Sequence, residues 1–293
     1  MICHRCKKEH EEETKTCESC KENMRAYYAE NLKKIRENQR TYHAENQESI
    51  NKRKQTYYVD NSEKMKKKDR LRNATVHRKF AYYENNARKR SIPFDITEEF
   101  VGVLTDQDCF YCGDKTSTAV RNGIDRLDNT IGYLEENCRS CCGVCNNMKR
   151  CLDALTFVER CSQVSLHNGH HGVMCDFWCD IKGSSYSVYK RRNNHKDFQL
   201  TEEEYTTLRR GDCTYCGRTC TDTHTNGIDR VNNEYGYVLD NCVSACFDCN
   251  NAKKSLNVDD FIKKCVSIAS KQHDIPYMPR CIEIWTQNRP KQK

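Results

Sequence analysis

Several features that define other classes of protein are scarce in this 293-residue chain. No run of residues approaches the roughly 18 apolar positions of a membrane-spanning helix, and the first residues lack the apolar segment of a secretory signal. Hydrophobic residues make up 37% of the chain and charged residues 31%, which excludes domains with a large apolar core. We therefore expect no membrane contact, and small domains that need stabilisation by bound metal.

Proline and glycine are also scarce, at four and twelve residues, and neither occurs between residues 23 and 80. That stretch is rich in Lys, Glu, Arg and Gln, and it predicts one long helix or two. A 15-residue repeat inside it places Tyr27, Tyr42 and Tyr57 in equivalent positions, each followed four residues later by Asn. Fifteen residues over four turns drift slowly around a helix, so these positions and the Ile or Met after them form one broad stripe.

The positive charge is concentrated in the first third of the chain. Residues 1–90 contain 24 Lys and Arg against 14 Asp and Glu, a net charge of +10, whereas residues 91–293 have a net charge of −3. Nucleic acid is the obvious polyanionic partner for such a surface. The residues that we expect to neutralise phosphates are Lys52, Arg53, Lys54, Lys64, Lys66, Lys67 and Lys68. A solvated helix that only spaces two domains is the alternative, and one arm could serve both purposes.

Cysteine, by contrast, is abundant, with 22 residues. Twelve of them form three quartets, each built from two Cys-x-x-Cys pairs, in which two thiolates of one tight turn can take two corners of a tetrahedral zinc site. The predicted zinc ligands are Cys3, Cys6, Cys17 and Cys20; Cys109, Cys112, Cys142 and Cys145; and Cys213, Cys216, Cys246 and Cys249. We expect about three structural zinc ions rather than disulfides, and a reducing compartment, the cytoplasm or nucleus.

The second and third of these cysteine quartets belong to an internal duplication with an offset of 104 residues. Each copy reads Cys-x-x-Cys-Gly, Asn-Gly-Ile-Asp-Arg, Gly-Tyr, Asn-Cys and Cys-x-x-Cys-Asn-Asn, followed by a lysine. The segments that precede the cysteines also correspond, since Thr97-Glu-Glu and Thr201-Glu-Glu both predict the N-cap of a helix. The duplicated unit is therefore the whole block and not the cysteine motif alone.

Together these motifs resemble the HNH (ββα-metal) nuclease family, in a variant with Arg in place of the usual His. The resemblance implies that Asp125 with Asn146, and Asp229 with Asn250, hold a catalytic Mg²⁺ or Mn²⁺ ion. It implies that Asn137 and Asn241 pin a loop through backbone hydrogen bonds. Arg126 and Arg230 occupy the position of the general base.

Arg126 and Arg230 differ from the histidine of the family at the general-base position, and this difference affects the mechanism. Arginine stays protonated in proteins and cannot accept a proton from water, although its guanidinium can stabilise charge on a scissile phosphate. The nucleophile would then be activated by the bound metal or by another residue, for which Tyr133 and Tyr237 are candidates. The alternative is that Asp125 with Arg126, and Asp229 with Arg230, form structural ion pairs in a nuclease that has lost its activity.

We therefore predict an α+β chain of small zinc-stabilised domains: a four-cysteine zinc knuckle (1–22), a basic helical arm (23–80) and two tandem HNH-like domains (81–170 and 171–293). The resemblance implies metal-dependent hydrolysis of double-stranded DNA, by a monomer if its two half-sites act together. Asp128 of the first copy is Asn232 in the second, which leaves open that only one site cuts. A catalytically inactive zinc-containing DNA-binding protein is the alternative. A zinc scaffold for protein assembly, without DNA affinity, is a third hypothesis.

Overall fold

The structure is a computed structural model that describes residues 2–9, 16–73, 75–116, 121–175, 177–178 and 180–280. It divides into two compact units, Met1–Lys68 and Asp69–Lys293, which are described separately below. Within the described ranges, no helix is long and apolar enough to cross a membrane. The C-terminal residues 281–293 of the second predicted HNH-like domain, and residues 10–15 of the predicted knuckle, lie outside the described part.

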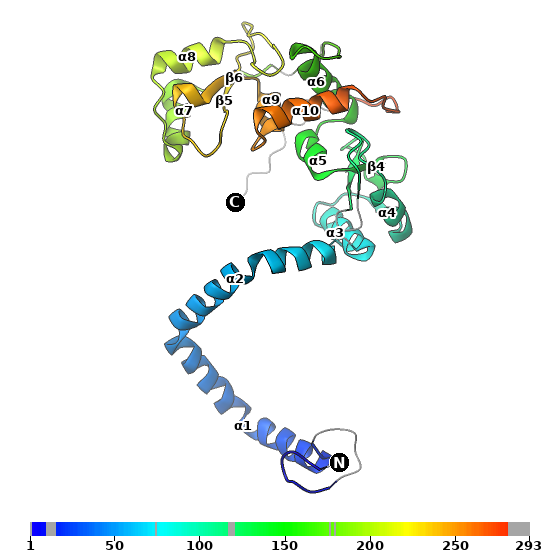
Figure 1. Cartoon of the computed structure of the whole chain (residues 1–293), viewed down its shortest axis with the longest axis vertical. Helices are drawn as coiled ribbons and strands as arrows, with labels where there is room; N and C mark the ends of the chain where they lie inside the picture. Colours follow the sequence, from blue (N-terminus) through cyan, green and yellow to red (C-terminus); the bar gives the residue numbers. More distant parts are fainter. Residues whose placement is uncertain are drawn as a thin grey trace. The chain divides into compact units, whose positions relative to one another are not determined.

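The first unit consists of a cysteine cluster and the helices α1 (Glu18–Glu45) and α2 (Gln47–Asn73), the second of which continues beyond it (Figure 1). The 15-residue repeat recurs in its hydrogen bonds. The side-chain amides of Asn31, Asn46 and Asn61 each donate to the backbone carbonyl four residues earlier, at 2.9 Å in all three cases. The tyrosines at those earlier positions stay exposed. The predicted phosphate-binding residues between Lys52 and Lys68 are exposed as well.

The predicted helical arm differs from the structure at its end. The chain forms a third helix, α3 (Val76–Lys89), which packs against α4 (Glu98–Thr105) in the second unit. The sequence of α3 is amphipathic, whereas that of α2 is not. The apolar face of α3 buries Ala87 and packs Phe80 and Tyr83 against the core. The stretch from residue 23 to 80 therefore contains two arm helices and the start of a helix that supports the duplicated fold.

The second unit contains both copies of the duplicated block, as a mixture of helices and short strands. In the first copy α3 and α4 are joined by β1 (Phe94–Asp95) and followed by β2 (Gly123–Arg126), β3 (Tyr133–Leu134), β4 (Cys138–Cys141), α5 (Gly143–Lys149) and α6 (Ala154–His167). The second copy contains α7 (Tyr186–Asn193), η1 (Asn194–Lys196), α8 (Glu202–Arg210), β5 (Gly227–Arg230), η2 (Leu239–Asn241), β6 (Cys242–Ala245), α9 (Phe247–Lys253) and α10 (Val258–Ala269).

Each copy is built around an antiparallel strand pair that leads into a short helix. β2 pairs with β4 so that Asp125 lies opposite Arg139, and β5 pairs with β6 in the same register. The helices α4 and α8 begin at the predicted caps, because the Thr97 hydroxyl accepts from the N–H of Phe100 and the Thr201 hydroxyl from that of Glu204. In each copy a small apolar cluster packs between these helices and the strands.

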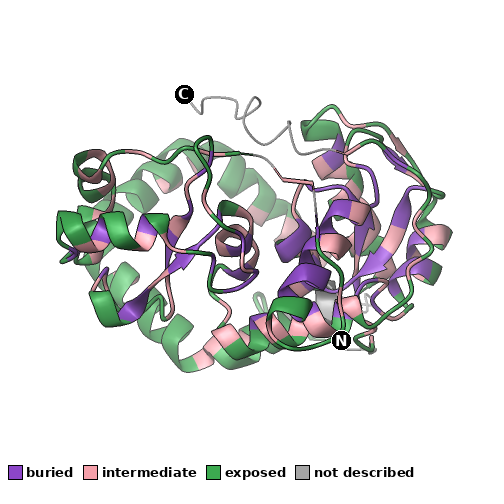
Figure 2. Ribbon diagram, turned by 90° about the horizontal axis from the view of Figure 1, so that it is seen from above, coloured by how far each residue is buried: buried purple, intermediate pink, exposed green. Residues whose placement is uncertain are grey.

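A larger core is shared by the two copies, because α6 packs against α10 (Figure 2, buried residues in purple). Polar contacts across this interface are reciprocal. Gln163 of α6 donates to the carbonyl of Cys216 at 2.8 Å, while Lys271, just after α10, donates to the carbonyl of Phe110 at 3.1 Å. The last helix of each copy thus supports the cysteine turn of the other. This mutual support explains why residues 69–293 form one compact unit although they contain two copies.

Candidate functional site

Three groups of four cysteines come together, and they are the three quartets that the sequence predicts. In each group the four sulfur atoms lie within 4.8 Å of one another. The Sγ atoms are 3.8 Å apart for Cys6 and Cys17, and 3.7 Å apart for Cys216 and Cys246. A tetrahedron with Zn–S bonds of about 2.3 Å has edges of about 3.8 Å, whereas a disulfide would be about 2.05 Å long. Each group could therefore hold a zinc ion.

Local backbone structure places the ligands in the duplicated unit. The first cysteine pair of each copy lies in a tight turn that ends at Gly113 or Gly217, with φ angles of 78° and 71°, a conformation that favours glycine. The second pair begins a helix. Cys142 is the N-cap of α5, and its sulfur accepts from the N–H of Cys145 at 3.4 Å. Backbone N–H groups aimed at a sulfur stabilise the thiolate form that binds metal.

The predicted catalytic aspartate, Asp125, is buried on β2 and has two partners. The hydroxyl of Tyr111 donates to its carboxylate at 2.7 Å, and the Nζ of Lys149 lies 3.1 Å from it. Lys149 is fully buried and also donates to the carbonyl of Arg126 at 2.8 Å. Burial raises the pKa of Asp125, an effect that the nearby ammonium of Lys149 opposes.

The second copy repeats this arrangement. The hydroxyl of Tyr215 donates to the carboxylate of Asp229 at 2.7 Å, and the Nζ of Lys253, also fully buried, lies 2.9 Å from the same carboxylate. A buried ammonium requires a counter-charge, and the aspartate provides it. The ion pairs of Asp125 with Arg126 and of Asp229 with Arg230 that the sequence suggested as an alternative are thus replaced by pairs with Lys149 and Lys253. Tyr111 and Lys149 recur 104 residues later as Tyr215 and Lys253, and this recurrence is the sequence signal that could have revealed the pairing.

Arg126 and Arg230 instead hold the loop that follows the strand. The Nη1 of Arg126 donates to the carbonyls of Asn129 and Ile131, and that of Arg230 donates to those of Asn233 and Tyr235. Each guanidinium also lies over the tyrosine of the Gly-Tyr motif, 5.0 Å from the ring centre of Tyr133 and 5.2 Å from that of Tyr237. The arginines therefore shape this loop, whatever further role they have.

Asn137 and Asn241 make backbone hydrogen bonds across the same loop. The Asn137 side chain accepts from the N–H of Asp128 and donates to the carbonyls of Asp128 and Gly132, all at 2.9 Å. Asn241 makes the equivalent three bonds at 2.9 to 3.0 Å with Asn232 and Gly236. The side chain thus closes the loop between the strand and the Gly-Tyr motif.

We expect Asn137→Ala to lower the free energy of unfolding by about 3 kcal/mol, because three hydrogen bonds contribute roughly 1 kcal/mol each. Urea denaturation of the full chain measures this change. Asn147→Ala, at an exposed position of the neighbouring helix, is the matched control and should change stability by less than about 0.5 kcal/mol. Equal effects of the two substitutions would contradict the loop-closing role of Asn137.

A cleft of about 610 Å³ opens beside β2 and α5, and its lining includes Asp125, Arg126 and Asn146. Three of the residues to which the resemblance assigns roles in the first copy therefore border one space. Tyr133 lines the same cleft, so it does face the site. In the second copy, Asn250 donates through its Nδ2 to the carbonyl of Ile228 at 3.0 Å, so its amide nitrogen is held by the strand.

The residue after α5 or α9 has a strained backbone in both copies. Arg150 has φ 56° and ψ −115°, and Lys254 has φ 48° and ψ −112°, a region that favours glycine. Arg150 also lines the cleft and donates to the Oδ1 of Asn251 at 3.1 Å. A basic residue occupies this position in both copies.

No family model matches the chain, and no solved structure matches it. An uncharacterized protein of Acanthamoeba polyphaga mimivirus is 36% identical over 195 residues, which cover 65% of this chain and 37% of that protein. The chain thus spans little more than a third of this relative, whose description states no activity.

Proposed function

We propose that this chain is a metal-dependent endonuclease that hydrolyses phosphodiester bonds of double-stranded DNA through HNH-like sites. The observation that carries the proposal is the cleft of the first copy, which brings Asp125, Arg126 and Asn146 to one space beside a strand pair and a short helix. The order of cysteine turn, strand, pinned loop, strand and helix in each copy supports it.

The donor atoms at this cleft fit a hard divalent cation such as Mg²⁺ or Mn²⁺. Carboxylate and amide oxygens are the ligand atoms that such ions prefer. A carboxylate offers about four acceptor positions, and Tyr111 and Lys149 use two of those on Asp125. Asp125 and Asn146 would hold the ion in the first copy, and Asp229 and Asn250 would do so in the second.

The side chains around the cleft define what the protein contributes to hydrolysis. The guanidinium of Arg126 can bind a phosphate, but an arginine cannot accept a proton from water. Burial raises the pKa of Tyr133. Its hydroxyl therefore stays protonated near neutral pH and cannot accept a proton from water. A divalent ion held by Asp125 and Asn146 would supply the Lewis acidity for activating water and phosphate that Arg126 and Tyr133 do not provide.

The duplication suggests how both strands are cut. The two copies form one compact unit, so a single chain presents two HNH-like sites without a dimer partner. We propose that the chain acts as a monomer on double-stranded DNA and works in the cytoplasm or nucleus, where the cysteine thiols stay reduced.

A catalytically inactive zinc-containing DNA-binding protein is the second candidate. The pairing of Asp125 with Lys149, and of Asp229 with Lys253, favours it, because an ammonium already neutralises each carboxylate. In that case the aspartates only stabilise the fold, and the cleft binds phosphate without cutting it.

Nicking of supercoiled plasmid DNA tests the proposal. We expect conversion to nicked and linear forms when Mg²⁺ or Mn²⁺ is added, and none when the divalent ion is omitted. Omission is preferable to a chelator, since a chelator would also remove structural zinc and unfold the protein. Salt-dependent DNA binding without nicking in any divalent ion would replace the nuclease with the binding protein.

A further inference from the structure

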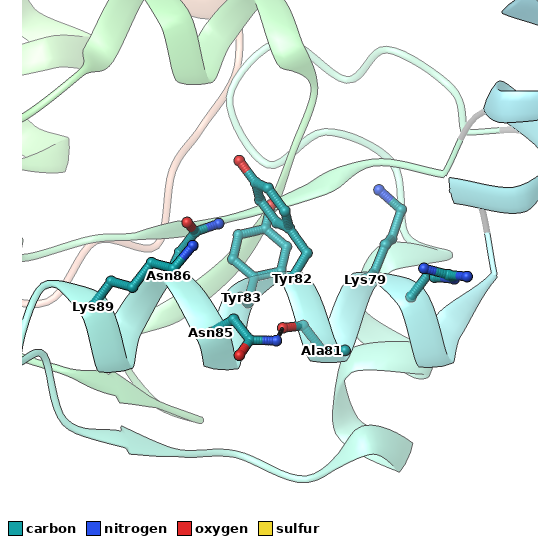
Figure 3. A pocket seen from close by; sticks show the side chains of 8 residues that line it. Lys79, Ala81, Tyr82, Tyr83, Asn85, Asn86 and Lys89 are labelled. Atoms are coloured by element: carbon teal, nitrogen blue, oxygen red, sulfur yellow. Dashed lines mark hydrogen bonds between the residues drawn. The ribbon is translucent and has the colours of Figure 1, made fainter. Parts of the chain in front are cut away.

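A second hollow lies beside α3 and leads toward the cleft. It is lined by Arg78, Lys79, Tyr82, Asn86 and Lys89 among others (Figure 3). Tyr82, Tyr83 and Asn86 line both this hollow and the cleft that contains Asp125. The two spaces are therefore neighbours along one helix, and a chain that occupies one can continue into the other.

The spacing along α3 explains why these side chains share a face. Arg78, Tyr82, Asn85 and Lys89 follow one another at intervals of four, three and four residues, which is the period of one side of a helix. Lys79, Tyr82 and Asn86 follow at intervals of three and four residues and form an adjoining row, which Figure 3 shows projecting from one side of α3, with Asn85 directed differently. Arg78 and Lys89 are exposed at either end of this face, about 16 Å apart along the axis.

The charge of this surface matches a polyanion. The hollow beside α3 has three basic residues and no acidic residue in its lining. The cleft has Arg90, Arg126 and Arg150 against Asp125 alone. Glu84, the acidic residue of α3, belongs to neither lining. The positive charge thus continues from the outer end of α3 to the site.

α3 is also firmly attached to the strand that carries the site. The hydroxyl oxygen of Tyr83 accepts a hydrogen bond from the N–H of Ile124, the residue before Asp125, at 2.7 Å. The ring of Tyr83 packs 5.8 Å from that of Tyr133. A ligand fixed on α3 is therefore held at a constant position relative to Asp125.

We propose that this face of α3 docks the DNA backbone on one side of the phosphate that is cut. The length between Arg78 and Lys89 corresponds to roughly five nucleotides at about 3.4 Å per step along one strand. Tyr82 and Asn86 lie between the two charged ends and contact the backbone as hydrogen-bond donors. This inference rests on the proposed nuclease function, to which it adds the path of the substrate.

The test is the salt dependence of DNA binding, measured by fluorescence anisotropy with a short duplex and the full chain, without added divalent ions. We expect the slope of log K against log [salt] to become shallower by about 0.9 in Lys89→Gln and by about 1.8 in Arg78→Gln/Lys89→Gln. Arg88→Gln is the matched control, because Arg88 neighbours Lys89 on the same helix, is also exposed, and donates to Asn85 without itself lining the hollow. Its slope should equal that of the wild type.

Two outcomes overturn the docking surface: an unchanged slope in the double variant, or an equal loss in Arg88→Gln. Plasmid nicking by the same preparations distinguishes this failure from failure of the nuclease proposal. A wild type that nicks DNA, with an unchanged slope in the double variant, removes the docking surface and keeps the nuclease. A wild type that binds but does not nick, with the expected loss of slope, keeps the docking surface and removes the hydrolysis.

Discussion

Replacement of Cys145 by serine is expected to unfold the second unit. Cys145 is fully buried in the core that both copies share, together with cysteines of both duplicated quartets. A structural zinc site contributes apparent binding energies of about 10 to 16 kcal/mol in small domains, which equals or exceeds the whole stability of a typical domain, about 5 to 15 kcal/mol. Circular dichroism should show loss of helical signal at room temperature, and elemental analysis should show at least one zinc ion fewer per chain.

Two cysteines outside that cluster serve as controls for this experiment. Cys151→Ser changes a half-buried cysteine that belongs to none of the quartets, and it should leave zinc content and the unfolding temperature unchanged. Cys20→Ser should remove one zinc ion from the first unit and leave the unfolding of the second unit as it was. A Cys145→Ser protein with wild-type zinc content and stability would show that this quartet is not a structural metal site.

The sequence was most informative where chemistry imposes a fixed spacing. Cys-x-x-Cys pairs, the 104-residue register and the threonine caps each depend on a few neighbouring residues, and the structure contains all of them. The helices of the arm were also predictable, because the stretch lacks Pro and Gly. The start of α3 was harder to place than its existence, since α3 differs from α2 mainly in the arrangement of Phe80, Tyr83 and Ala87 on one face.

The lysine partners of Asp125 and Asp229 were not predicted from the sequence, because these contacts depend on how distant segments fold together. Arg126 follows Asp125 directly, but its guanidinium donates to the loop carbonyls of Asn129 and Ile131. Lys149 is 24 residues away and reaches Asp125 because α5 folds back onto β2. The shared core was equally hidden, since nothing in one copy indicates that its last helix will pack against the other copy.

Asp125→Asn combined with Lys149→Met is expected to abolish nicking by the first copy while the protein stays folded. Asp125→Ala alone is a poor test, because it leaves the buried ammonium of Lys149 without a counter-charge, at a cost of about 3 to 5 kcal/mol. Replacement of both members of a buried pair by neutral groups of similar size is often close to neutral for stability, and the lost bond from Lys149 to the Arg126 carbonyl adds a cost of roughly 1 kcal/mol. The asparagine keeps an acceptor for the Tyr111 hydroxyl, while the site loses the carboxylate that would hold the metal.

The double variant therefore separates the two proposed functions, because it removes the catalytic charge without the folding defect. Asp229→Asn/Lys253→Met is the matched change in the second copy, and comparison of the two variants shows which copy cuts. If Asp125 holds a catalytic ion, adding Asp125→Asn/Lys149→Met to the second-copy variant should lower its remaining nicking by about 100-fold or more, since a catalytic metal contributes several kcal/mol to the transition state. A folded protein with both pairs changed that nicks DNA at the wild-type rate would limit both aspartates to a structural role as counter-ions of the buried lysines.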